Sequence, residues 1–235
     1  VLGVTLLFSS ITLGRDTTWI DLPLLMVVVL VTWFLLNDLE LSRSNSLVLL
    51  GMLALFFFRV AQHARQSNDG VETREIPTLT LPLAWLSFLG GLVLLIASSR
   101  ILVWAASHIA TELGVSELVI GLTIVAVGTS LPELTASVMS ALKGHADMAV
   151  GAIVGSNMFT MLLVLPIPGL WGSLSLQTAV ISRDMVAVFL TTLFLALAAM
   201  WRWNGVSGSG TLGRGTGLLL LSLYIAYYGW LFLVP

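Results

Sequence analysis

The chain contains no cysteine and few charged residues, and these two shortages limit what kind of protein it is. Without cysteine it forms no disulfide, holds no metal through a thiolate and has no cysteine nucleophile. Only 9% of its 235 residues are charged and 57% are hydrophobic, whereas soluble domains carry about 25% charged residues. The composition therefore predicts a protein that lies in a lipid bilayer.

The few charges also lack the patterns that suit nucleic acid or an enzyme. Ten lysines and arginines stand against 12 acidic residues, which gives a net charge of −2 and leaves no basic stripe. The three histidines, His63, His108 and His145, are far apart in the sequence and have no metal-ligand spacing. We therefore expect no nucleic-acid partner, no cofactor and no enzymatic activity.

Long hydrophobic runs predict an all-α, polytopic membrane protein with about seven full transmembrane helices plus a partial one. The chain begins at Val1 inside an apolar run, so the first helix is expected to be incomplete. The segment 204–215, rich in glycine and serine, is expected to be a flexible surface loop. The predicted spans are 1–12 (partial), 19–37, 46–61, 83–106, 116–142, 147–165, 185–201 and 216–233.

Basic residues in the loops predict the orientation of these spans. When successive loops are placed on alternate sides, one side receives seven basic residues and the other receives two. Because cytoplasmic loops are enriched in lysine and arginine, the first side is expected to be cytoplasmic and the C-terminus to lie outside. The first side carries Arg15, Arg59, Arg65, Arg74, Lys143, Arg202 and Arg214, and the second carries Arg43 and Arg183.

Two stretches of the chain resemble each other weakly, which suggests an internal duplication. At an offset of 163, Val1 and Asp21 match Val164 and Asp184 in character, and at an offset of 171 Leu41-x-Arg43 matches Leu212-x-Arg214. Leucine-rich helices align easily by chance, but here the charged residues match as well. We expect residues 1–61 to be the remainder of a first repeat, 62–81 a cytoplasmic linker and 82–235 a second repeat of five helices. An odd number of helices in each repeat would invert one repeat against the other.

The segment 121–160 is the best candidate for a functional site. Glu133 is a carboxylate deep inside an apolar run. Placing a carboxylate there costs several kcal/mol unless it is paired, protonated or facing water. Pro132 must also release a backbone carbonyl about one turn earlier, near Gly128. One helix face is expected to present Ala126, Thr129, Ser130 and Glu133.

The helix that follows offers further oxygens, from Ser156, Asn157 and Thr160. Gly151 and Gly155 form a GxxxG pattern, which is typical of closely packed membrane helices. Carboxylate, hydroxyl and carbonyl oxygens suit hard cations such as Na⁺ or Ca²⁺. Two alternatives are that Glu133 faces the surface from a loop, and that the hydroxyls only pack one helix on another.

The motifs of this segment closely resemble the second signature repeat of the cation/calcium exchanger superfamily, and most of all its bacterial sodium/calcium antiporters. The resemblance implies a ten-helix inverted-repeat protein that exchanges Ca²⁺ for Na⁺ or H⁺ by alternating access. It also implies that Glu133 bridges the cations and that the Ala126 carbonyl, Thr129, Ser130 and Ser156 supply further oxygens. The matching motifs are Gly121-Leu-Thr123, Ala126-x-Gly128-Thr129-Ser130-Leu-Pro132-Glu133, Ala149-Val-Gly151 and Gly155-Ser156-Asn157-x-Phe159.

The sequence departs from this family in two ways. Thr160 stands where an asparagine or aspartate is usual, and the whole first signature repeat is absent. The chain is therefore expected to be a fragment of an antiporter or, alternatively, a degenerate member that acts as a structural or regulatory membrane partner. Expected partners are the lipid bilayer, the transported cations, and either the missing N-terminal repeat or another copy in a homo-oligomer. The resemblance implies a bacterial inner membrane as the location.

Overall fold

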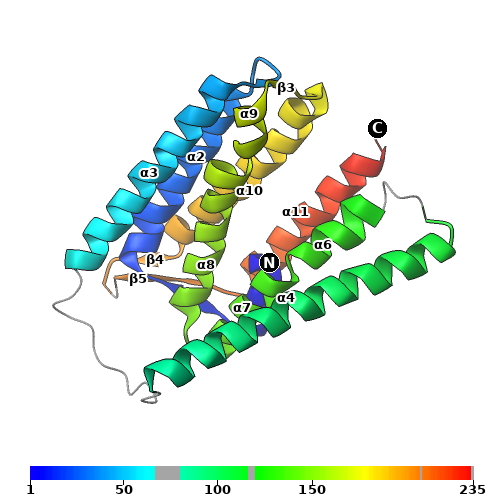
Figure 1. Cartoon of the computed structure of the whole chain (residues 1–235). Helices are drawn as coiled ribbons and strands as arrows, with labels where there is room; N and C mark the ends of the chain where they lie inside the picture. Colours follow the sequence, from blue (N-terminus) through cyan, green and yellow to red (C-terminus); the bar gives the residue numbers. More distant parts are fainter. Residues whose placement is uncertain (67–79, 116–119, 207, 234–235) are drawn as a thin grey trace. The chain divides into compact units, whose positions relative to one another are not determined.

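The computed structural model describes residues 1–66, 80–115, 120–206 and 208–233, and these residues are mainly helical (Figure 1). The chain divides into two compact units, one made of Val1–Asn68 with Ser137–Pro235 and the other of Asp69–Ala136. Residues 67–79, most of the predicted linker 62–81, and residues 116–119, the start of the predicted helix 116–142, lie outside the described residues.

The described residues of the first unit form seven whole helices and the end of an eighth, together with short strands and π-helical turns (η). α7 (Leu131–Leu142) begins in the second unit and ends in the first. The other elements are α1 (Leu2–Phe8), β1 (Ile11–Leu13), η1 (Thr17–Asp21), α2 (Leu22–Leu35), β2 (Glu40–Leu41), α3 (Arg43–Gln66), α8 (Ala146–Phe159), η4 (Thr160–Val164), α9 (Ile167–Trp171), β3 (Leu174–Ser175), η5 (Val180–Asp184), α10 (Met185–Trp201), β4 (Trp203–Asn204), β5 (Ser209–Leu212) and α11 (Arg214–Leu233).

The second unit consists of one long helix and a broken one that packs on it. α4 (Leu81–Glu112) has 32 residues and contacts η3 (Gly121–Val125) and α6 (Ala126–Thr129). The first part of α7 follows directly after α6. α4 exposes most of its apolar side chains, including Trp104 at 69%, as expected of a helix that faces lipid.

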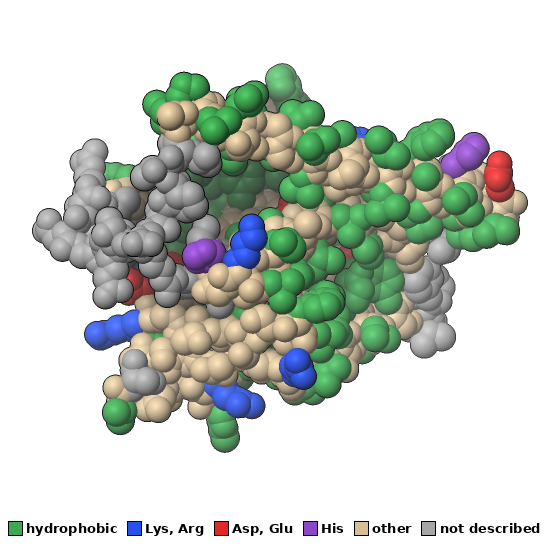
Figure 2. Space-filling model, turned by 90° about the horizontal axis from the view of Figure 1, so that it is seen from below, with side chains coloured by type: hydrophobic (Ala, Val, Ile, Leu, Met, Phe, Trp, Pro, Cys, Tyr) green, Lys and Arg blue, Asp and Glu red, His purple; other side chains and the backbone are tan. Residues whose placement is uncertain are grey.

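Five helices of the described residues are long and apolar enough to cross a membrane, or six if the bent pair Thr123–Thr129 and Leu131–Leu142 counts as one span. They agree with six of the seven full spans that the sequence predicts. α11, over the seventh, has 20 residues but does not belong to this set. The count of seven is therefore not confirmed. On the face seen in Figure 2, hydrophobic side chains far outnumber charged ones, which suits a bilayer.

The predicted flexible loop at 204–215 is wrong, because this segment forms a β-hairpin. β4 pairs with β5, and β5 also pairs with β1 in a three-stranded sheet. Gly208, with a φ of 63°, supplies the left-handed conformation that the turn requires. Gly210 lies so close to α10 that an added Cβ would be 3.2 Å from the Ala199 carbonyl oxygen. The glycines therefore allow tight packing here.

The two small sheets are related by the offsets found in the sequence. In one sheet Ile11 pairs with Leu212, and in the other Leu174 pairs with Leu41. The offset of 163 relates Ile11 to Leu174, and the offset of 171 relates Leu41 to Leu212, so the two pairs occupy equivalent positions. The next pair, Thr12 with Thr211, is carried in the same way onto Ser175 with Glu40. The π-helical turns follow too, since η1 and η5 differ by 163 at both ends.

Helix packing repeats this relation with the large and small residues exchanged. α1 lies on α11 where Leu6 meets Gly217, and a Cβ added at Gly217 would be 2.8 Å from both the Gly3 carbonyl oxygen and Leu6 Cβ. The equivalent positions, Gly169 and Ser46, meet where α9 lies on α3. One glycine in each pair lets the helices approach closely.

The core of the first unit lies between these helix pairs. α2 packs on α10, and α8 packs on α2 and β1. Fully buried side chains at its centre include Leu22 and Val29 of α2, Ala149 and Met158 of α8, and Ala199 of α10.

Gly217→Ala should destabilise the first unit by about 1–3 kcal/mol, because its Cβ collides with backbone that has no rotamer to change. Thermal unfolding in one detergent measures the effect. Gly229→Ala is the matched control, since it lies in the same helix with nothing within 4 Å of an added Cβ. Equal unfolding temperatures for the two variants would contradict close packing at Gly217.

Candidate functional site

The predicted single helix over 116–142 is broken at Ser130 in the structure. Its two parts, Thr123–Thr129 and Leu131–Leu142, are bent by 46°. Ser130 has φ −91° and ψ 1°, and its N–H donates to the Val127 carbonyl at 3.1 Å. Pro132 explains the break, because it has no N–H to donate to the carbonyl four residues earlier.

The carbonyl of Ala126 accepts hydrogen bonds from two hydroxyls beside this break. Thr129 Oγ1 donates to it at 3.1 Å and Ser130 Oγ at 3.4 Å. The structure therefore brings three of the predicted ligand residues together around one oxygen. Each hydroxyl also retains lone pairs that a cation could use. This cluster at Ala126 lies two residues before Gly128, whose carbonyl Pro132 deprives of its usual N–H donor.

Glu133 lies in the first turn of α7, one turn after this cluster, and its side chain is exposed. A carboxylate is favoured there because the N-terminal end of a helix carries positive partial charge. Among the described residues, Glu133 forms no ion pair. Its charge therefore remains available to a cation.

Ser156, Asn157 and Thr160 belong to the other compact unit, on α8 and at the start of η4. Val154, Met158 and Leu162 of the same segment are buried in the core. Asn157 and Thr160 are exposed and Ser156 is half-buried, so their oxygens lie on the side turned away from that core. A single helix face thus offers three of the predicted oxygens.

The GxxxG pattern of α8 does not pack against a helix in the described part of the chain. Nothing lies within 4 Å of a Cβ added at Gly151 or at Gly155. Gly128, which belongs to the predicted motif, packs closely instead, a role that its sequence context did not indicate. A Cβ added there would run into the side chain of Val103 on α4. Gly128 therefore holds α6 close against α4.

Within the described ranges, no group of three or more His, Cys, Asp or Glu residues lies close enough to hold a metal ion. A cation bound at the helix break would therefore depend on one carboxylate with hydroxyl and carbonyl oxygens. Such oxygen-only ligand sets suit hard cations and not zinc or copper.

Comparison with known proteins gives matches over most of the chain. A family model described as sodium/calcium exchanger protein matches residues 83–233. The putative antiporter CaxA of Alkalimonas amylolytica is 35% identical over 99% of this chain and 73% of its own length. Inner membrane protein YrbG of Escherichia coli (strain K12) is 33% identical over 99% of this chain and 72% of its own length.

The fold is similar to that of a solved structure. The sodium-calcium exchanger NCX_Mj, soaked with Na⁺ and Sr²⁺, superposes with a TM-score of 0.76 and 26% sequence identity. The match covers 97% of this chain and 70% of that one.

Gly128→Ala should lower the unfolding temperature, because overpacking against Val103 costs about 1–3 kcal/mol. Gly121→Ala, in the same segment with nothing within 4 Å of an added Cβ, is the control. The double variant Gly128→Ala/Val103→Ala should recover part of the loss, since it removes the side chain that the new Cβ meets. Additive losses in a thermal-unfolding series would contradict this contact.

Proposed function

The chain belongs to the sodium/calcium exchanger protein family, and from this premise we propose that it exchanges Ca²⁺ for Na⁺ or protons by alternating access. The family predicted from the sequence and the helical membrane fold are both confirmed. CaxA is named a putative antiporter and NCX_Mj a sodium-calcium exchanger, so the chain is a cation antiporter by family. The choice of ions and the transport cycle are the proposal.

The observation that carries this proposal is the cluster at the helix break. The Ala126 carbonyl, Thr129 and Ser130 lie one turn before the exposed carboxylate of Glu133. In this proposal Glu133 supplies the charge and the other three supply neutral oxygens. Because a hard cation prefers such oxygens, the break becomes half of a transport site.

Ser156, Asn157 and Thr160 are proposed to supply the second set of oxygens. Ca²⁺ prefers six to eight oxygen ligands, which the cluster at the break does not provide alone. The exposed face of α8 and η4 offers hydroxyl and amide oxygens of the required kind. Thr160, as a neutral hydroxyl, is expected to be the weakest of these ligands.

An inverted duplication is the proposed basis of alternating access. Its repeats are residues 1–61 and 82–235, joined by the linker 62–81. The shared register of the two small sheets at offsets 163 and 171 supports it. The helix contacts support it as well, because the contact of Leu6 with Gly217 has its equivalent in the contact of Gly169 with Ser46. Inverted repeats supply the two related arrangements that open a central site to either side of a membrane.

A cytoplasmic position of the β1–β5–β4 end, with the C-terminus outside, is proposed from charge. α2 begins and α10 ends at this sheet, whereas α2 ends and α10 begins at the β2–β3 sheet. Chain connectivity puts Arg15, Arg202 and Arg214 at the first end. Arg43 and Arg183 lie at the second. The more basic end is the one that cytoplasmic enrichment in lysine and arginine favours.

Glu133→Gln should reduce the calcium flux at least about tenfold. A loss of about 1.4 kcal/mol in the free energy of cation binding already weakens binding by that factor. Glutamine keeps the shape and removes the charge. Calcium flux into vesicles at equal protein abundance measures it.

Glu112→Gln is the matched control, because Glu112 is also an exposed carboxylate but ends α4, beside His108. Full flux in the Glu133 variant would disprove its role. Absence of flux in the unmutated protein, under both sodium and proton gradients, would favour the structural or regulatory alternative.

Thr160→Asp should tighten Ca²⁺ binding, because a second carboxylate is a stronger ligand for a divalent cation than a hydroxyl is. Thr160→Val keeps the side-chain shape but removes the oxygen, so it should weaken binding. Calorimetry on both variants in one detergent gives the order of affinities. Unchanged or weaker Ca²⁺ binding in the aspartate variant would mean that Thr160 does not face the cation.

A further inference from the structure

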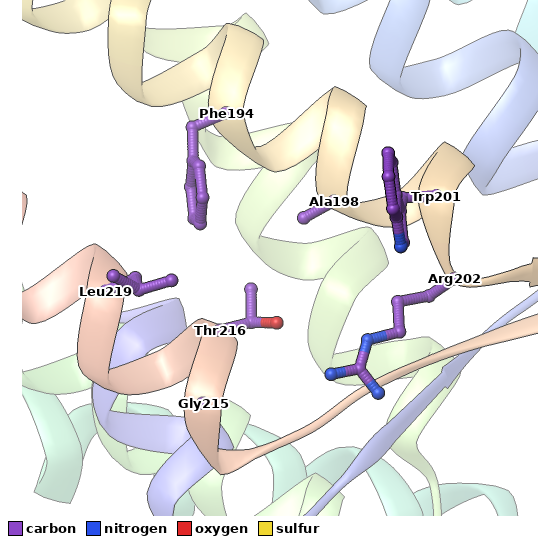
Figure 3. A pocket seen from close by; sticks show the side chains of 7 residues that line it. All are labelled: Phe194, Ala198, Trp201, Arg202, Gly215, Thr216 and Leu219. Carbon is purple, nitrogen blue, oxygen red and sulfur yellow. The ribbon is translucent and has the colours of Figure 1, made fainter.

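A pocket of about 300 Å³ opens between the end of α10 and the start of α11 (Figure 3), and none of the candidate cation-site residues lines it. Both helices belong to the first unit, so all the residues that line the pocket lie within one compact unit. Its walls are polar at one end and apolar at the other. The transport proposal does not use it.

The polar end of the pocket is formed by Arg202 and Thr216. Arg202 directly follows the span Val180–Trp201, so its guanidinium lies at the level of lipid headgroups. In the part of the chain that the structure describes, Arg202 forms no ion pair and its side chain is exposed. The hydroxyl of Thr216 points toward the same side of the pocket (Figure 3). The guanidinium and the hydroxyl are therefore two donors that an acceptor in the pocket could use.

The apolar end runs from this level toward the hydrocarbon. Ala198 lies about one turn before Arg202 on α10 and Phe194 about two turns before it, and Leu219 lies opposite them on α11. Trp201, 91% exposed, stands at the edge, as interfacial tryptophans do. The pocket thus has the length and polarity of a headgroup joined to the first part of an acyl chain.

Charge selects the kind of lipid. Arg15 and Arg214 lie at the same end of the first unit as Arg202. Basic pockets between membrane helices bind anionic headgroups, and Arg202, the basic residue that lines this pocket, is expected to contribute about a fivefold preference. A zwitterionic lipid would place its own cation near Arg202 and gain less.

We propose that this pocket binds one anionic phospholipid. Its phosphate accepts hydrogen bonds from Arg202 and Thr216, and one acyl chain lies along Phe194, Ala198 and Leu219. A free phosphate ion would leave the apolar walls uncovered, so the lipid is the occupant. The bound lipid fastens the start of α11 to the end of α10.

The test uses the whole protein in micelles containing equal amounts of phosphatidylglycerol and phosphatidylethanolamine. Native mass spectrometry counts the lipids that stay bound. The unmutated protein should retain phosphatidylglycerol about fivefold over phosphatidylethanolamine, and Arg202→Gln should retain both equally. Arg15→Gln is the control at the same membrane end but outside the pocket lining. An equal loss in the control, or no loss in Arg202→Gln, would overturn the proposal.

A second pair of variants tests the apolar wall without changing charge. Ala198→Trp fills the pocket and should remove the tightly held lipid. Leu197→Trp adds the same ring to the neighbouring residue, which is 56% exposed and does not line the pocket. Retention of the lipid in Ala198→Trp would overturn the acyl-chain assignment, as would its displacement by inorganic phosphate at millimolar concentration.

Discussion

A proline in a membrane-spanning helix leaves a backbone carbonyl without its N–H donor, and hydrocarbon offers no water in its place. The segment around Pro132 breaks at Ser130, whose N–H donates to the Val127 carbonyl and therefore not to that of Ala126. Two hydroxyls then satisfy the Ala126 carbonyl. The same oxygens, with Glu133 one turn later, are what a hard cation requires. The need to satisfy the backbone and the ability to bind a cation therefore arise from one local feature.

The break also depends on support from the neighbouring helix. Gly128 lets α6 approach Val103 of α4 so closely that a single methyl group does not fit between them. In the first unit, two small sheets and two helix pairs hold the other elements in a repeated arrangement. Glycine occurs in both helix pairs but on different partners, Gly217 in one and Gly169 in the other. In both pairs the glycine allows the two helices to approach closely.

Much of the fold was predictable because membrane spans are long and apolar. The predicted span 185–201 coincides with α10, and the motif around Pro132 located the oxygen cluster. The strands were not predictable, because two to four residues are too few to show an alternating pattern. The glycines that matter for packing were not identifiable either. Gly151 and Gly155 have the familiar spacing but no neighbour, whereas Gly217 meets Leu6 from the far end of the chain. The pocket at Arg202 likewise exists only after α10 and α11 come together.

We propose above all that this chain moves calcium across a membrane in exchange for a second cation. Uptake of radioactive Ca²⁺ into sealed vesicles containing the purified protein tests this most directly. Vesicles loaded with Na⁺, or with protons at acidic internal pH, should accumulate Ca²⁺ against its gradient. Vesicles loaded with choline at equal pH on both sides should not. Equal uptake with and without the driving gradient, or none in either case, would contradict the account.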